Sequence, residues 1–165
     1  MADLVQWPAM LPAPRAGGYN VQPTQTFVRT DMDNGSARQR RRFTTVPNYV
    51  DVTWMLSIDQ FSVFEAFLAY DINLGADWFA TNLLNGLGVS QMQARFKDNP
   101  PYKAALSDSR TYFNVTASLE VKSMPLLTRD QYSVAKQYSA TEIAAMSDGL
   151  HQLVHVQLPG PGRWE

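Results

Sequence analysis

The sequence predicts an α+β domain built mainly from antiparallel sheet, with one principal helix and an extended arm at each end. Three observations lead to this fold class. Apolar and polar residues alternate over several short stretches, as they do in half-buried strands. One stretch near the middle carries aromatic residues at helical spacing. Prolines gather in residues 1–24, where they disfavour both helix and sheet.

The bulk composition favours a folded domain and excludes several classes of function. With 165 residues, 45% of them hydrophobic, the chain can bury a core as one domain with appendages. A formal net charge of −1 argues against a dedicated nucleic-acid-binding protein. The absence of cysteine excludes disulfides and thiolate chemistry. We find no signal peptide and no apolar stretch long enough to span a membrane, so we expect a soluble cytoplasmic protein.

Residues 1–24 are predicted to form a proline-rich N-terminal arm. The high density of prolines, together with the Gly17-Gly18 pair, favours an extended chain. The segment also carries Trp7 and several aliphatic residues, which make it more apolar than a solvated linker. Two interpretations stay open. The segment is either a free terminus or an ordered arm on another subunit, and in the second case Trp7 is an interface residue.

A basic hairpin is predicted next, at the start of a β-rich core domain that spans residues 25–124. Residues 24–29 have strand composition, and residues 31–35 supply turn chemistry that ends in Gly35. Residues 38–45 should return as the second strand. Since side chains alternate along a strand, Arg38, Arg40 and Arg42 are expected on one face, with Gln39, Arg41 and Phe43 on the other.

The arginines of this second strand are the strongest polar signal in the chain. They are Arg38, Arg40, Arg41 and Arg42. No further Lys or Arg occurs until Arg95, and five acids occupy the gap: Asp51, Asp59, Glu65, Asp71 and Asp77. Like charges on one strand repel, so a partner is expected. The near-neutral total and the unaccompanied acids favour a protein partner, while phosphate contact with DNA and a merely solvated face stay open.

The rest of the core domain is predicted as further strands and one helix. The strands are expected at residues 49–56, 78–84, 89–97 and 111–122, and all but the second of these have apolar residues on alternate positions. The helix is expected at about residues 58–72.

Ser57 and Gln60 form a capping box that begins this helix. Four apolar side chains then share one helix face and are interpreted as core: Phe61, Phe64, Phe67 and Leu68.

Residues 125–165 are predicted to form a C-terminal arm. A second capping box begins at Thr128, and residues 141–148 favour a short helical turn. The tail over residues 150–164 alternates weakly, as a strand does, and we expect Trp164 to contribute apolar contact at an interface.

No motif predicts catalysis, a metal site or a cofactor. Phosphate-binding loops, the dinucleotide fingerprint and the nucleophile elbow are all missing from the sequence. His151 and His155 have the spacing of metal ligands on a helix, but their surroundings are strand-like and lack the acidic base of a zinc hydrolase. Asp71 and Asp77 could pair in acid–base chemistry, but no other polar cluster converges on them in the sequence. We therefore expect a non-enzymatic protein without a small-molecule substrate.

The order of motifs resembles that of a group of small bacteriophage virion proteins. The residues that carry the resemblance are Trp7-Pro8-x-x-Leu11-Pro12-x-Pro14, the run from Arg29 through Gly35 to Arg38-x-Arg40-Arg41, the Trp54 strand, the helix from Phe61 to Phe67, Gly75-Ala-Asp-Trp78-Phe79, Ala94-Arg95-Phe96 and the strand from Val115 to Val121. This order is also similar to that of the minor tail protein M family of long-tailed phages. The resemblance covers roughly residues 7–125, and the chain departs from that family at the turn Met32-Asp-Asn-Gly35-Ser.

This resemblance implies a ring-forming structural subunit of a phage tail, synthesised in the host cytoplasm and located in the virion. The fold that it implies is the β-barrel or sandwich with a flanking helix that tail-tube proteins share. Its partners would be further copies of the chain and other tail proteins at the neck, tube end or baseplate. The alternative function is a DNA-contacting connector of the head–tail neck.

Overall fold

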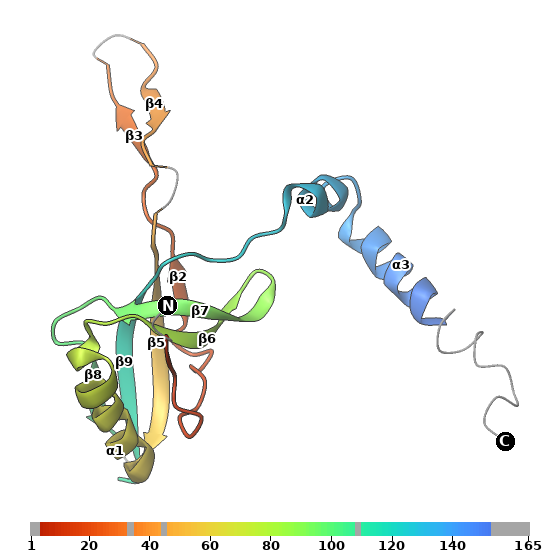
Figure 1. Ribbon diagram of the computed structural model, residues 1–165. Coiled ribbons are helices and arrows are strands. Elements are labelled where there is room, and N and C mark those ends of the chain that lie inside the picture. The colour runs from red at the N-terminus through yellow and green to blue at the C-terminus, as the bar shows by residue number, and fades with distance from the viewer. Residues whose placement is uncertain (1–3, 33–34, 44–45, 108–109, 153–165) are drawn as a thin grey trace, which may run out of the picture. The chain divides into compact units, whose positions relative to one another are not determined.

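The computed structural model describes residues 4–32, 35–43, 46–107 and 110–152 (Figure 1). The chain divides into two compact units, residues 1–125 and residues 126–165. The predicted α+β class with mostly sheet is confirmed.

A mixed seven-stranded sheet forms the body of the first unit, within the described residues. Its strands are β1 (Val5–Gln6), β2 (Asn20–Gln22), β5 (Asn48–Ser57), β6 (Phe79–Asn85), β7 (Gly88–Phe96), β8 (Lys103–Leu106) and β9 (Tyr112–Val121). They follow the order β1-β6-β7-β9-β5-β2, with β8 also paired to β9. The β1–β6 pair is parallel and the other pairs are antiparallel. Strand β9 therefore joins the two halves of the sheet, since it pairs with β5, β7 and β8.

Strands β5 and β9 form the longest ladder, in which Trp54 lies opposite Val115 and Val50 lies opposite Leu119. The predicted alternation is confirmed, because the even positions from Val50 to Leu56 are buried while Asn48 and the odd positions of β5 are exposed or half-buried. The buried side chains of the two strands are Val50, Val52, Trp54, Leu56, Val115, Leu119 and Val121. One face of this ladder therefore belongs to the core, and the other carries polar side chains such as Asp51 and Thr53.

Helix α1 (Ile58–Ala66) begins at the predicted capping box. The Gln60 backbone N–H donates to Ser57 Oγ at 3.3 Å, and the Ser57 N–H donates to Gln60 Oε1 at 3.0 Å. The predicted single helix over residues 58–72 instead changes form after α1. It widens into the π-helix η1 (Phe67–Asp71) and then, after Ile72, tightens into the 3₁₀ turn η2 (Asn73–Gly75).

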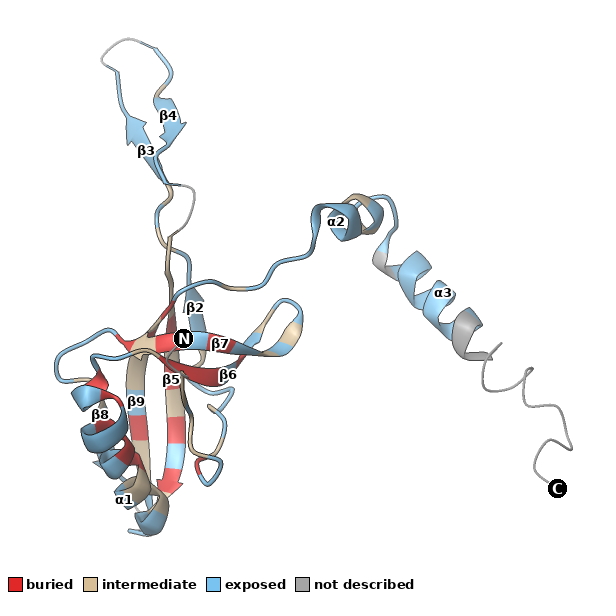
Figure 2. Ribbon diagram, in the orientation of Figure 1, coloured by how far each residue is buried: buried red, intermediate tan, exposed pale blue. Residues whose placement is uncertain are grey.

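The buried face of this helical segment continues through the change of form (Figure 2). Phe64, Phe67, Leu68 and Ile72 are all buried, and Phe61 is half-buried beside them. The predicted helical spacing of the aromatic residues therefore identified core positions correctly.

The residues around Trp7 form the aromatic centre of the core. The Trp7 ring stacks on the Trp54 ring with centroids 5.1 Å apart and planes at 18°. Its centroid also lies 5.5 Å from that of Phe67 and 5.8 Å from that of Phe79. Four residues further along the chain, Leu11 is buried as well.

The N-terminal segment, predicted as an arm, thus contacts the core of its own chain through Trp7 and Leu11, although most of residues 13–23 are exposed. Strand β1 pairs with β6, and the Trp7 N–H donates to the Ala80 carbonyl at 2.8 Å. The apolar residues of this segment were evident from the sequence, but their contacts were not. The rings that pack against Trp7 come from residues far along the chain. The prediction that Trp7 lies at an interface gains no support from this position.

The second unit holds two helices, α2 (Arg129–Ala135) and α3 (Ala140–Gln152). The predicted second capping box is confirmed, since the Thr128 N–H donates to Gln131 Oε1 at 3.0 Å and the Gln131 N–H donates to Thr128 Oγ1 at 3.3 Å. No described side chain of this unit is buried.

Helix α3 corrects two predictions about the tail. Residues 141–148, predicted as a short turn, form part of a longer helix, and Leu150, predicted to start a strand-like arm, lies in that helix. The physical reason is a good helix start, in which the Ser139 N–H donates to Glu142 Oε2 at 2.7 Å and lowers the pKa of the Glu142 carboxyl. Once a helix is nucleated, adding residues is favourable, and this outweighs a weak alternation.

We expect Trp7→Ala to lower the free energy of unfolding of the first unit by about 2–4 kcal/mol. Replacing a core tryptophan by alanine costs about 3–5 kcal/mol, and Trp7 is only partly buried. Urea unfolding followed by far-UV circular dichroism measures the change. The matched control is Met10→Ala in the same segment, where Met10 is 55% exposed and we expect a change within about 0.5 kcal/mol. If Trp7→Ala changes the free energy of unfolding as little as Met10→Ala does, the segment does not anchor the core.

Candidate interaction surface on the basic hairpin

Strands β3 (Phe27–Thr30) and β4 (Arg38–Arg41) form a two-stranded antiparallel sheet that is separate from the seven-stranded one. The predicted hairpin is therefore confirmed, although its strands are shorter than expected. Every residue of both strands is exposed (Figure 2). A two-stranded hairpin without a packed face is marginally stable in water. The hairpin therefore lacks a core of its own and offers both faces for contact.

The register of the hairpin sorts its side chains into two faces. Val28 lies opposite Arg40 and Thr30 lies opposite Arg38, so these four residues share one face. Phe27 lies opposite Arg41 on the other face. The predicted separation of Arg38 and Arg40 from Arg41 is thus confirmed.

A groove of about 450 Å³ lies on the hairpin, and we call it the basic groove. Its lining residues are Val28, Thr30, Met32, Arg38, Gln39 and Arg40. The groove combines two guanidinium groups with apolar surface, which Val28 and Met32 contribute. This apolar component was missed at the level of the sequence, where the arginines dominate the pattern.

The arginines of the hairpin differ in their contacts. Arg29 Nε donates to Asp31 Oδ1 at 2.9 Å, and Arg41 Nε donates to the Phe43 carbonyl at 2.9 Å. Arg42 lies 5.6 Å from the centroid of the Phe43 ring. Among the described residues, no carboxylate forms an ion pair with Arg38 or Arg40. The two guanidinium groups of the basic groove are therefore the ones best placed to receive an anionic partner.

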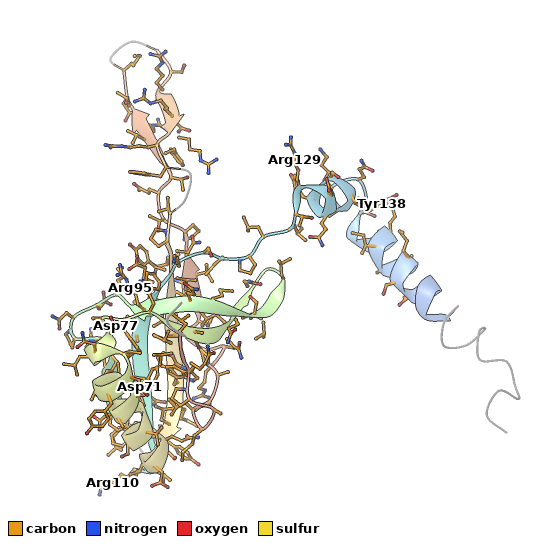
Figure 3. All side chains as sticks on the ribbon, viewed as in Figure 1. Asp71, Asp77, Arg95, Arg110, Arg129 and Tyr138 are labelled. Carbon is orange, nitrogen blue, oxygen red and sulfur yellow. The ribbon has the colours of Figure 1, made fainter. Side chains whose placement is uncertain are left out.

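The acids predicted as uncompensated lie mainly on the α1–η2 segment and the turn after it. Asp59, Glu65, Asp71 and Asp77 are exposed, and Figure 3 labels the last two. Glu65 accepts a hydrogen bond from the Tyr102 hydroxyl at 3.1 Å, and burial together with this carboxylate raises the pKa of Tyr102.

Asp51 differs from the other acids between Arg42 and Arg95, because its carboxylate is already hydrogen-bonded within its own sheet. Its carboxylate accepts hydrogen bonds from Ser118 Oγ at 2.5 Å and from Gln22 Nε2 at 2.6 Å. Asp51 is also only half-buried on the polar face of β5 rather than fully exposed. The carboxylate of Asp51 is therefore not a candidate for contact with a basic partner.

Arg95, the first basic residue after Arg42, also has its partners within its own chain. Arg95 Nε donates to Glu120 Oε2 at 2.7 Å, and the Arg95 guanidinium lies 4.7 Å from the centroid of the Trp78 ring. The hydrogen bond from Arg95 to Glu120 raises the pKa of Arg95. This contact joins β7 to β9 across the polar face of the sheet.

Other predicted candidates give no second site in the part of the chain that the structure describes. No three His, Asp or Glu side chains gather there as metal ligands. None of the helices there is both long and apolar enough to cross a membrane. His151 lies in α3, while His155 and Trp164 fall outside the described residues.

Comparison with known proteins finds no matching protein-family model, no matching curated protein and no matching solved structure.

Trypsin is expected to cut the first unit earliest in β4. The arginines there are exposed, and the hairpin opens at little cost in free energy because only a two-stranded ladder holds it. Mass spectrometry of the early fragments identifies the cut sites. Arg95 serves as the internal control, since it lies in a strand with neighbours on both sides and should resist cleavage until the sheet unfolds. Cleavage at Arg95 as early as in β4 would contradict the hairpin's low stability.

Proposed function

We propose that the chain is a structural subunit of a bacteriophage tail, which forms a ring with copies of itself and contacts other tail proteins. The observation that carries this proposal is the β3–β4 hairpin, a fully exposed two-stranded sheet with neighbouring like charges. The folding of such an element contributes little free energy of its own, and a partner of opposite charge would stabilise it. The resemblance of the motif order to minor tail proteins supports the assignment to a phage tail.

The mechanism of this function is association rather than chemistry. In the proposed ring, the arginines of β4 contact an acidic surface on the adjacent copy, and the exposed carboxylates of the α1–η2 segment supply that surface. Arginine suits this role because its planar guanidinium binds a carboxylate through two parallel hydrogen bonds. Single exposed ion pairs stabilise by about 0.2–1 kcal/mol, so several must act together or be desolvated in the contact.

We further propose that the sheet of the first unit is the counterpart of the β-sandwich or barrel of tail-tube proteins, with α1 as its flanking helix. The ring would lie in the virion, at the neck, the tube end or the baseplate. The antiparallel β5–β9 ladder and the helix that follows β5 support this comparison.

Reversing two charges of the hairpin tests the proposal. We expect Arg40→Glu combined with Arg41→Glu to abolish assembly and leave the monomer folded, because the exposed side chains contribute little to the core. Mass photometry measures particle mass, alone and with preformed tail tubes, and circular dichroism checks the fold. Lys103→Glu combined with Lys122→Glu is the matched control, with the same change in net charge at exposed positions elsewhere. A hairpin variant that assembles like the natural chain would refute this mechanism.

A DNA-contacting connector is the second candidate function, because Arg38, Arg40, Arg41 and Arg42 could neutralise phosphates. In that case, the logarithm of the duplex-binding constant would fall with the logarithm of the salt concentration, with a slope of about −0.9 per phosphate contact. The Arg40→Glu, Arg41→Glu variant would make this slope less steep. Absence of duplex binding at low salt would leave the tail subunit as the better explanation.

A further inference from the structure

The basic groove of the hairpin is suited to a partner that is apolar as well as acidic. Val28 is 42% exposed and Met32 is 52% exposed, and both line the groove beside Arg38 and Arg40. A purely acidic partner would satisfy the guanidinium groups but leave this apolar surface in water. The complementary surface therefore combines carboxylates with a projecting apolar side chain.

The segment from Tyr70, near the end of η1, to Asp77 has this combination of residues. Tyr70 is 85% exposed and Leu74 is 71% exposed, and the exposed Asp71 and Asp77 lie in the same short segment. We call these four residues the acidic knob. In the same stretch Ile72 is buried, so the segment is anchored to the core while its acidic and apolar side chains face solvent.

The backbone of the acidic knob holds Leu74 outward in an unfavourable conformation. Asn73 (φ 47°), Leu74 (φ 57°) and Gly75 (φ 95°) are all in the left-handed region, where a leucine is rare. The turn is fixed by hydrogen bonds from the Gly75 N–H at 2.9 Å and the Asp77 N–H at 3.2 Å to the Ile72 carbonyl.

Glycine or asparagine at position 74 would serve the fold better than leucine. Both adopt the left-handed conformation more readily, and the exposed Leu74 side chain adds little to the core of its own chain. Strain retained at an exposed apolar residue points to a role outside the monomer.

We propose that the acidic knob of one copy docks into the basic groove of a second copy. Leu74 then covers the apolar surface of Val28 and Met32, and the carboxylates of Asp71 and Asp77 accept hydrogen bonds from Arg38 and Arg40. This inference rests on the self-assembly proposed above and names its contact. Because the groove and the knob are different surfaces of the same chain, the contact is head-to-tail and generates a ring if its rotation closes.

Two charge-reversed variants test this pairing by complementation. Variant one is Arg38→Glu with Arg40→Glu, and variant two is Asp71→Arg with Asp77→Arg. Each alone places like charges in the contact, and we expect at least a tenfold loss of self-association, since 1.4 kcal/mol corresponds to tenfold. Mixed together, the natural groove of variant two meets the natural knob of variant one, and the two reversed surfaces also match. The mixture is therefore expected to assemble, as mass photometry would show.

The outcomes of the mixing experiment separate this inference from the proposed function. If the natural chain assembles and variant two assembles equally well, or if the mixture stays monomeric, the knob is not the partner of the groove, although self-assembly stands. If the natural chain stays monomeric both alone and on preformed tail tubes, the proposed function and this inference both fail. Circular dichroism of each variant confirms that the chains are folded.

Leu74→Asn tests the apolar part of the contact without disturbing the fold. Asparagine tolerates the left-handed conformation, so we expect an equal or higher urea midpoint together with weaker association. Leu126→Asn, at another strongly exposed leucine, is the matched control and should leave association unchanged. Association of Leu74→Asn as tight as that of the natural chain would overturn the role of Leu74.

Discussion

The packing of Trp7 against Trp54 is the contact on which the rest of the first unit depends. The same rings contact Phe64 of α1 and, through Trp7, Phe79 of β6. Phe79 in turn stacks on Phe96, whose side chain closes over Gly75, where a Cβ atom would lie 3.2 Å from it. The aromatic cluster therefore joins the N-terminal segment, the sheet and the helix, and it also determines where the acidic knob is held.

Local features of this fold could be predicted from the sequence, and contacts between distant segments could not. The capping boxes at Ser57 and Thr128, the alternation along β5 and the β3–β4 hairpin depend on neighbouring residues alone. Strand β8 was missed because its residues carry no clear alternation and gain their order from pairing with β9. For the candidate site, the arginines were evident, whereas the exposure of Leu74 follows from a backbone conformation that only the folded turn defines.

The second unit and the hairpin share one physical property, which is the lack of buried residues of their own in the part that the structure describes. In the second unit, apolar side chains of α2, of α3 and of the turn between them line an exposed groove of about 550 Å³; they include Val134, Tyr138, Ile143 and Met146. Isolated helices of this length are marginal in water even when they are well capped. The chain thus combines one well-packed body with two elements whose own folding supplies little stability.

The low intrinsic stability of the hairpin has a kinetic consequence for a ring built in the proposed way. A flexible, highly charged element finds an oppositely charged partner quickly through electrostatic steering. Ordering the hairpin on contact lowers the net affinity, so a single contact also dissociates readily. Misplaced subunits would then leave before the ring closes, whereas closure gives every subunit two contacts and a much longer residence time. Weak order in the free chain would thereby favour accurate assembly over fast but irreversible aggregation.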